Sequence, residues 1–464
     1  MTIGRQTRRD AGILGFGLAA TAVSFAGVLD PDLFSVWLVR AVVLLQAMLT
    51  SYRMIWPSTD IRLVTPLFLL PMMAMLFFSV APTVFSLTGA LPPAPQAMYD
   101  RIITYSGSHS EFIVLQFIAL CLLGAALLPD GPARKGLLDR LDHGRRRRAM
   151  TGCLSIAVLC AVTKFIDTHA VPLAELPLAG LGNLFRTALP PILYFCLAAA
   201  LAISLRCGRR AVYAALAIGI GSLVLFVLSD LARLPLSFGA FALLMMCAMI
   251  SLPPRKTVLL CAAIALAVGL LAAAAYSYRT AYIEQAAAAP GNPIVRAVAT
   301  KLLHRQTVSG WCLEQARARH WDDAPRGRYL DFVSGLVPRA LWPGKPNLSR
   351  GTDYAVTYCG AEINPEKPHS EALTLLAEPI IEGGLRGLLI GEALLLGFVG
   401  LLSVLMLRTG DIGIIAGTAL LPWLTAFEEH LTYYLANCTK MLLIMLPFAL
   451  ALHWYAQRSR TKRT

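Results

Sequence analysis

Charged residues are scarce in this chain, and acidic residues are scarcer than basic ones. Of the 464 residues, 15% are charged and 57% are apolar, with 27 acidic against 41 basic side chains. The apolar residues come in long runs, and about 20 consecutive apolar residues suffice to cross a bilayer as a helix. The composition therefore predicts a polytopic membrane protein with an all-α fold.

Several motifs of nucleotide and metal chemistry are absent. The chain has no Walker loop, no G-x-G-x-x-G after a strand and no H-E-x-x-H. These absences argue against ATP-driven transport, dinucleotide chemistry and zincin proteolysis. No pair among its eight histidines has zinc-ligand spacing. The formal charge of +14 does not indicate a nucleic-acid partner, because most of the excess lies in short loops that would contact anionic lipid headgroups of the bilayer.

The basic loops predict how the chain is oriented. The loop 129–148 contains Arg145-Arg146-Arg147-Arg148 and is expected to be cytoplasmic, because basic residues collect on the inner side of a membrane. Counting spans from this loop places the other basic clusters and both termini on the same side. About twelve spans fit. We expect them at 11–29, 34–52, 64–91, 111–128, 149–166, 185–205, 212–230, 238–252, 257–277, 385–407, 412–426 and 441–456.

This topology divides the chain into three parts. Residues 1–277 form an N-terminal bundle of about nine helices, and residues 385–464 supply about three more. Between them, residues 278–384 form one large outward loop, and a loop of this length is usually functional. Within the loop we expect an amphipathic helix over Ile294–Gln306 and a short helix from Ser370 to a C-terminal cap at Gly383-Gly384.

The loop contains the stretch Val337–Pro346, in which three prolines restrict the backbone. Arg339 and Lys345 flank Trp342, a combination suited to holding a phosphate beside a sugar. Further along, Glu371, Glu378 and Glu382 share one helical face by their spacing. A structured connector whose charges face water explains these residues equally well.

The cysteines of the loop suggest a covalent link. Cys312 and Cys359 both lie in the outward loop, whereas most of the ten cysteines lie inside apolar runs. In an oxidising periplasm these two thiols could form a disulfide that closes the loop.

Ionisable residues at membrane depth are a second group of candidates. Arg40 and Glu392 cannot easily reach water, so we interpret them as functional and Arg40 as suited to an anionic headgroup. We expect the long or polar side chains near helix ends to reach the interface instead. These are Lys164, Arg186 and Asp230.

Two short outward loops are also polar. Asp30-Pro31-Asp32 has the D-x-D form that can hold a divalent cation, although a turn that ends a helix explains it as well. We interpret Glu428-Glu429-His430 as a solvated turn, with a place in the same site as the alternative.

The segment 338–387 resembles a known family. Pro338-Arg339, followed by Leu341–Pro346, and then Glu378–Gly387 entering the next helix, resemble the Wzy-type O-antigen and exopolysaccharide repeat-unit polymerases. These belong to the O-antigen polymerase and ligase superfamily. The chain differs in having Glu382 before the first glycine, where family members have an aromatic residue.

The resemblance implies an enzyme with a fold similar to the GT-C glycosyltransferases. It would join undecaprenyl-diphosphate-linked oligosaccharides on the periplasmic face of a bacterial inner membrane, with no metal or cofactor. A chain-length regulator is a candidate protein partner. Candidates for binding the diphosphate are Arg339, Lys345, Arg350, Arg328 and Arg40. Candidates for the catalytic proton transfer are His369, Glu378 and Asp353. Trp342 is the candidate for stacking on a sugar.

Three other functions remain open. An O-antigen ligase would use a similar loop and lipid donor with another acceptor, and a metal-dependent glycosyltransferase would use Asp30 and Asp32. A lipid-linked oligosaccharide flippase would show paired halves and broken helices, and no similarity between halves is visible.

Overall fold

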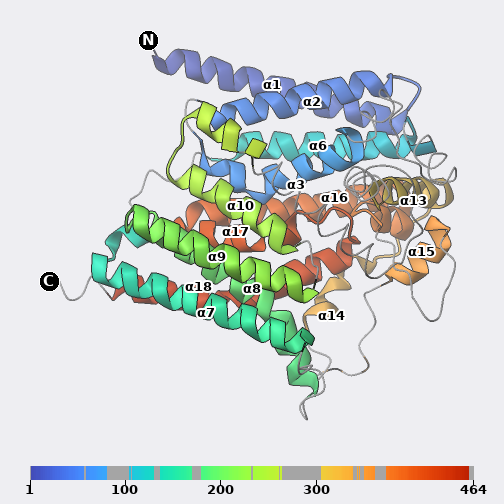
Figure 1. Cartoon of the computed structure of the whole chain (residues 1–464). Helices are drawn as coiled ribbons and strands as arrows, with labels where there is room; N and C mark the ends of the chain where they lie inside the picture. Colours follow the sequence, from blue (N-terminus) through green and yellow to red (C-terminus); the bar gives the residue numbers. More distant parts are fainter. Residues whose placement is uncertain are drawn as a thin grey trace, which may run out of the picture.

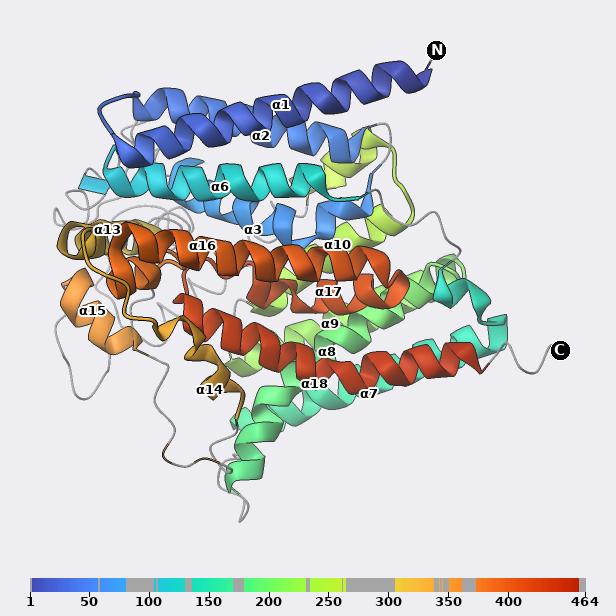
Figure 2. The ribbon, with the colours of Figure 1, turned by 180° about the vertical axis from the view of Figure 1, so that it is seen from behind.

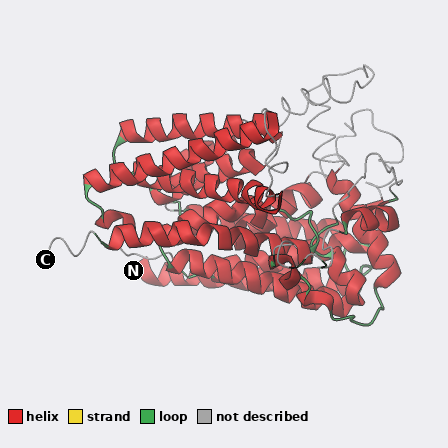
Figure 3. Cartoon of the chain, turned by 90° about the horizontal axis from the view of Figure 1, so that it is seen from below, coloured by secondary structure: helices red, strands yellow, loops and turns green. Residues whose placement is uncertain are grey.

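Every regular secondary-structure element in the described part of the chain is a helix or a helical turn. The computed structural model describes residues 2–56, 59–80, 104–105, 107–129, 136–169, 179–230, 234–260, 262–263, 305–337, 342, 344, 350–360 and 373–458. Within these ranges there is no β-strand, as Figure 3 shows. The all-helical fold agrees with the composition, because only helices and closed barrels satisfy every backbone polar group inside lipid.

Eleven described helical elements lie in the first 249 residues. In chain order these are α1 (Thr2–Leu29), α2 (Val36–Ile55), the 3₁₀ turn η1 (Ile61–Val64), α3 (Pro66–Met75), the π-helical turn η2 (Leu76–Val80), α6 (His109–Leu127), the 3₁₀ turn η3 (Leu137–Arg140), α7 (His143–His169), α8 (Ala179–Ser204), α9 (Arg209–Asp230) and α10 (Leu234–Met249).

The C-terminal half begins with short helices and ends with long ones. Its elements are α13 (Arg305–His320), the 3₁₀ turn η6 (Arg328–Leu330), α14 (Phe332–Leu336), α15 (Gly351–Cys359), α16 (Ala377–Arg408), α17 (Asp411–Leu424) and α18 (Leu431–Gln457).

The chain is a multi-pass membrane protein by the length and hydropathy of its helices. Eight described helices contain a stretch long and apolar enough to cross a bilayer. These stretches are Asp10–Leu29, Val36–Ile55, His109–Leu127, His143–His169, Arg186–Ser204, Arg209–Leu228, Ala377–Arg408 and Leu431–Gln457. Three shorter apolar helices, Pro66–Met75, Ser237–Met249 and Asp411–Leu424, pack among them. The span expected at 257–277 lies mostly outside the described residues.

The long helices lie side by side and alternate in direction. In Figure 1, α1, α2 and α6 form one side of the bundle, α7, α8 and α9 form the other, and α16 and α17 lie between them. Figure 2 shows α16 and α18 from behind, both running from the side of α13 and α15 toward the side of the C-terminus, with α17 between them. Close packing uses small residues: a Cβ added to Gly27 of α1 would overlap the Phe112 ring of α6.

The two ends of the bundle differ in what they contain. Both chain termini lie at one end, together with the start of α7 and the end of α16, and we call this the basic end (Figure 1). The short helices α13 and α15 lie at the opposite end, which we call the α13 end.

An ionic network holds the basic end together. The Arg206 guanidinium binds Asp139 (Nε to Oδ1, 2.7 Å) and the buried Asp411 (Nη2 to Oδ1, 2.9 Å). The second Asp411 oxygen accepts a hydrogen bond from the Leu138 backbone N–H at 2.9 Å. The network therefore links η3, the turn that follows α8, and α17, and both oxygens of the buried carboxylate are used.

Lys164 was expected to reach the membrane interface, but it does not. It is buried on α7, and its Nζ lies 3.6 Å from Oδ2 of the buried Asp167. The half-exposed Arg186 binds the same carboxylate at 2.9 Å. Two cations beside one carboxylate compensate the charge of Asp167, which explains why Lys164 can stay buried. The side chain of Asp230 lies outside the described residues.

Candidate functional site

The first turns of α16 shape the candidate site. We expected a helix from Ser370 that ended at Gly383-Gly384, but residues 373–376 are not helical and α16 begins at Ala377. The two glycines end these first helical turns, as expected, because neither has helical backbone dihedrals. A second helix follows the kink directly and runs to Arg408, so α16 consists of two helices joined at Gly383-Gly384.

The break exists because another segment needs the same space. Gly384 has φ +55°, and a Cβ on it would overlap the Trp321 carbonyl, so glycine is required there. The Trp321 carbonyl accepts a hydrogen bond from the Leu385 N–H at 3.0 Å, and the Glu382 carbonyl accepts one from the Arg326 N–H at 2.8 Å. The segment that follows α13 is therefore bound into the interrupted helix, which fixes the backbone of Glu382.

Glu378 is buried at the start of α16 and is fully engaged. Its Oε2 accepts a hydrogen bond from the Thr432 backbone N–H, and its Oε1 accepts one from the Thr432 hydroxyl, both at 2.8 Å. Thr432 lies in the first turn of α18, where backbone N–H groups have no partner inside the helix. Glu378 therefore joins the starts of α16 and α18.

Glu382 lies one turn further along α16 and faces Arg350. Arg350 Nη1 is 3.4 Å from Glu382 Oε1, and the other oxygen, Oε2, is buried without a hydrogen-bond partner among the described residues. Burial alone would lower the pKa of Arg350, but its interaction with Tyr354 and the negative charges of Glu382 and Glu378 raise that pKa above its ordinary value. Arg350 therefore remains a cation beside two carboxylates.

His430 completes this group of side chains from a third direction. It precedes α18 and is only 6% exposed, and neither ring nitrogen has a hydrogen-bond partner among the described residues. Its ring meets the Tyr354 ring edge to face at 5.5 Å. Burial and, second, the positive charge of Arg350 lower the pKa of His430 to about 4. The imidazole is therefore neutral at pH 7 and offers one donor and one acceptor.

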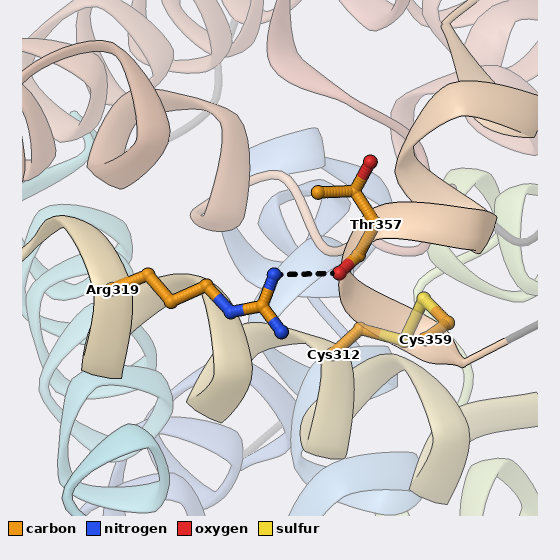
Figure 4. Close-up of a disulfide and its surroundings, with 4 residues drawn as sticks. All are labelled: Cys312, Arg319, Thr357 and Cys359. Atoms are coloured by element: carbon orange, nitrogen blue, oxygen red, sulfur yellow. Dashed lines mark hydrogen bonds between the residues drawn. A yellow bond between two sulfur atoms is a disulfide. The ribbon is translucent and has the colours of Figure 1, made fainter.

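Tyr354 lies on α15 and Arg350 immediately precedes that helix, and α13 holds α15 in place. A disulfide joins Cys312 of α13 to Cys359 of α15, and Arg319 donates to the Thr357 carbonyl at 2.9 Å (Figure 4). His320 on α13 also hydrogen-bonds the Tyr358 hydroxyl at 2.8 Å. This is the link between Cys312 and Cys359 that we expected as a closure of the loop.

The group formed by Arg350, Glu378, Glu382, Tyr354 and His430 is referred to below as the Arg350 cluster. It combines one guanidinium and two carboxylates with a neutral imidazole and a phenol. Such a set can bind hydroxyl groups, pair with an anion and accept a proton. No group of three His, Cys, Asp or Glu side chains within the described ranges is arranged to hold a metal ion.

The structure brings only some of the predicted site residues into the Arg350 cluster. Glu378 and Arg350 are in the cluster, whereas Arg339, Lys345 and His369 lie outside the described residues. Three predicted residues are described and exposed, and their side chains lie on the surface. These are Arg328 in η6, Asp353 in the first turn of α15, and Trp342.

Arg40 is already neutralised by a carboxylate. The buried Arg40 on α2 forms a bidentate ion pair with the buried Glu111 of α6, with Nη2 and Oε2 2.6 Å apart. Its guanidinium also lies over the Trp37 ring, 4.7 Å from the centroid. These contacts tie α2 to α6, so they explain Arg40 without an anionic ligand. Glu392 accepts a hydrogen bond from Gln116 at 3.1 Å within the bundle.

The interpretation of Glu428-Glu429-His430 as a solvated turn is wrong for His430, because that side chain is buried in the cluster. The sequence contains one indication of this burial, because the histidine directly precedes a long apolar helix. Its burial depends on α15, which packs against it from 70 residues or more earlier in the chain. The pair Asp30 and Asp32 forms a turn instead, in which the Asp32 N–H donates to Asp30 Oδ1 at 3.1 Å.

Comparison of the chain with protein-family models, with curated proteins and with solved structures finds no match in any of the three.

Proposed function

We propose that the chain is a glycosyltransferase that polymerises undecaprenyl-diphosphate-linked oligosaccharide repeat units at the periplasmic face of a bacterial inner membrane. The observation that carries this proposal is the Arg350 cluster, in which two buried carboxylates and a buried imidazole lie around a partly exposed cation at the membrane end of the long loop. Ionisable groups buried near a membrane usually mark a substrate site. The resemblance of the segment 338–387 to Wzy-type polymerases supports the same reading.

The proposed topology has about twelve spans in a GT-C-like arrangement, with both termini cytoplasmic. The eight long helices and three shorter ones account for most of these spans, and the segment 257–277 would supply another. The basic loops lie at the end opposite α13 and α15, which supports a periplasmic loop. Reporter fusions at the C-terminus test this orientation, and a C-terminus found outside would contradict it.

In the proposed reaction, Arg350 binds the donor diphosphate together with Arg339 and Lys345 of the loop. Arginine can neutralise a leaving diphosphate by paired hydrogen bonds, so the proposal includes no metal. The acceptor hydroxyl attacks the anomeric carbon through an oxocarbenium-like state. A base must take the hydroxyl proton. Glu378 was a candidate, but both of its oxygens already accept hydrogen bonds from Thr432.

The direct test is to incubate the purified protein with lipid-diphosphate repeat units, with and without EDTA. A ladder of products that persists in EDTA supports the polymerase. A single transfer to lipid A core would support a ligase instead, and loss of the ladder in EDTA would support a metal-dependent enzyme. Absence of any product, together with transport of the substrate across vesicles, would support a flippase.

A further inference from the structure

The ion pair between Arg350 and Glu382 is incomplete. It consists of one contact, between Nη1 and Oε1 at 3.4 Å, and Glu382 Oε2 has no hydrogen-bond partner among the described residues although it is buried. The pair formed by Arg40 and Glu111 shows what a complete pair looks like in this protein, since it is bidentate and buried on both sides. A buried carboxylate oxygen that lacks a partner raises the free energy of the resting state.

Both members of the pair stand on fixed backbone. The Glu382 carbonyl accepts a hydrogen bond from the Arg326 N–H, and the break in α16 follows directly. Arg350 immediately precedes α15, which the disulfide ties to α13. The two side chains can therefore separate by rotamer changes while the backbone around them stays in place. Arg350 is also the more exposed of the two, with 31% of its side chain accessible against 7% for Glu382.

We propose that this pair is exchanged during the reaction: the donor diphosphate takes Arg350 from Glu382, and the released Glu382 becomes the base for the acceptor hydroxyl. This inference rests on the proposed function and names the base of that same site. A diphosphate competes well for Arg350 because it offers several anionic oxygens, whereas Glu382 uses only one of its own.

The bonds and protons balance in this step. The acceptor oxygen forms a bond to the anomeric carbon as the bond from that carbon to the diphosphate oxygen breaks. The diphosphate leaves with the electron pair, and Arg350 stabilises its new charge. The acceptor proton moves to Glu382, which returns to Arg350 after losing that proton to water. Because Glu382 is released only when the diphosphate arrives, donor binding precedes activation of the acceptor.

Glu378 serves as the matched comparison for Glu382. The two residues are one turn apart on α16 and equally buried, but both Glu378 oxygens are held by Thr432. Glu378 therefore cannot leave Thr432 without losing two hydrogen bonds. We assign it a positioning role, in which it fixes the start of α16 against α18.

The test measures binding of farnesyl diphosphate, a short polyprenyl diphosphate, to the purified full chain in detergent, with farnesol as the uncharged control. Glu382→Gln frees Arg350, so this variant should bind the probe about threefold to tenfold more tightly than the wild type. Glu378→Gln should show no such gain, and Arg350→Gln should lose the binding. In the polymerisation assay, Glu382→Gln should lose the product ladder.

Unchanged or weaker binding by Glu382→Gln, or a ladder that persists in it, would overturn the exchange. If the wild type binds farnesyl diphosphate no better than farnesol, the proposed function itself fails, and the two failures are thus distinguishable. Glu382→Asp provides a second variant in case the amide disturbs folding. Its shorter side chain keeps a base but moves away from Arg350, so tighter probe binding with partial retention of the ladder is expected. Weaker probe binding by Glu382→Asp would contradict the exchange as well.

Discussion

Ion pairs between arginine and a buried carboxylate occur at both the basic end and the α13 end of the bundle, but the pair of Asp411 and the pair of Glu382 differ in how completely the carboxylate oxygens are hydrogen-bonded. At the basic end, Arg206 binds Asp139 and Asp411, and both oxygens of the buried Asp411 have partners. At the α13 end, Arg350 makes one long contact with Glu382, and His430 has no hydrogen-bond partner among the described residues. Satisfied polar groups stabilise a fold, whereas buried unsatisfied ones persist where a ligand completes them. From this difference we propose that the basic end is structural and the α13 end functional.

The largest effect should follow from removing the central cation of the α13 end. Arg350→Ala should lower the polymerisation rate by at least about 100-fold, because the charge that stabilises the leaving diphosphate is lost. The thermal unfolding midpoint should fall, because the buried Glu382 loses its cation, but by less than in Arg206→Ala, because Arg350 makes one contact of 3.4 Å whereas Arg206 binds two carboxylates. Arg326→Ala, which removes an exposed cation from the segment that follows α13, is the control. A normal product ladder in Arg350→Ala would contradict the functional reading of this end.

The converse variant at the basic end should affect stability and leave binding unchanged. Arg206→Ala leaves the buried Asp411 charge without its cation, which should lower the free energy of unfolding by about 3 to 5 kcal/mol. Binding of farnesyl diphosphate, measured at a temperature where the variant is folded, should equal that of the wild type. Arg210→Ala removes an exposed cation nearby and should be neutral. Weakened diphosphate binding in Arg206→Ala would remove the distinction between the two ends.

The disulfide between Cys312 and Cys359 should hold α15 in place at the α13 end. Replacing Cys312 and Cys359 together by serine removes a crosslink between residues 47 positions apart, so the free energy of unfolding should fall by about 2 to 4 kcal/mol. Polymerisation should fall as well, because Tyr354 lies on α15 and Arg350 immediately precedes that helix. Cys207→Ser, at the basic end, should change neither property. Full activity in the double variant at a temperature where it remains folded would show that α15 is positioned by other contacts.

The long helices could be predicted from the sequence because apolar runs report burial in lipid directly. The expected span 111–128 corresponds to α6 (His109–Leu127), and the short expected spans 238–252 and 412–426 correspond to the short helices α10 and α17. The Arg350 cluster could be predicted only in part. Its members come from three separate helix starts, so no periodicity relates Arg350 and Glu382 to His430.

Two features of the structure could not be predicted from local sequence. Gly383-Gly384 ends a helix, as its composition predicts, but only the Trp321 carbonyl, more than 60 residues earlier, shows why the chain turns there into a second helix. Arg40 at membrane depth has the features of a ligand site, and only Glu111, 71 residues later, shows that its charge is compensated. Both distinctions depend on tertiary neighbours, which local sequence does not contain.

A smaller effect should appear in the pH dependence of stability. His430 has a pKa of about 4 in the folded chain against an ordinary value of 6.5, so the unfolded chain binds the proton first as the pH falls. The contribution of neutral His430 is therefore complete above about pH 6.5 and is lost as the pH falls toward 4. Between pH 7 and pH 5 the wild type should lose about 2 kcal/mol more than His430→Gln. Parallel pH profiles for the two proteins would show that His430 is not buried as described.

The smallest effect on stability should come from Trp342, the exposed aromatic residue proposed to stack on a sugar. Trp342→Ala should change the free energy of unfolding by less than about 0.5 kcal/mol, because nearly half of the residue is exposed to solvent. If the ring stacks on the acceptor, the KM for the repeat unit should rise by up to about tenfold with little change in kcat, and Trp342→Phe should restore most of the affinity. Trp454, similarly exposed near the end of α18, gives the matched variant at the basic end. Since no substrate is proposed to reach that end, Trp454→Ala should leave KM unchanged. Equal KM values for Trp342→Ala and Trp454→Ala would therefore exclude Trp342 from the site while leaving the assignment of the Arg350 cluster in place.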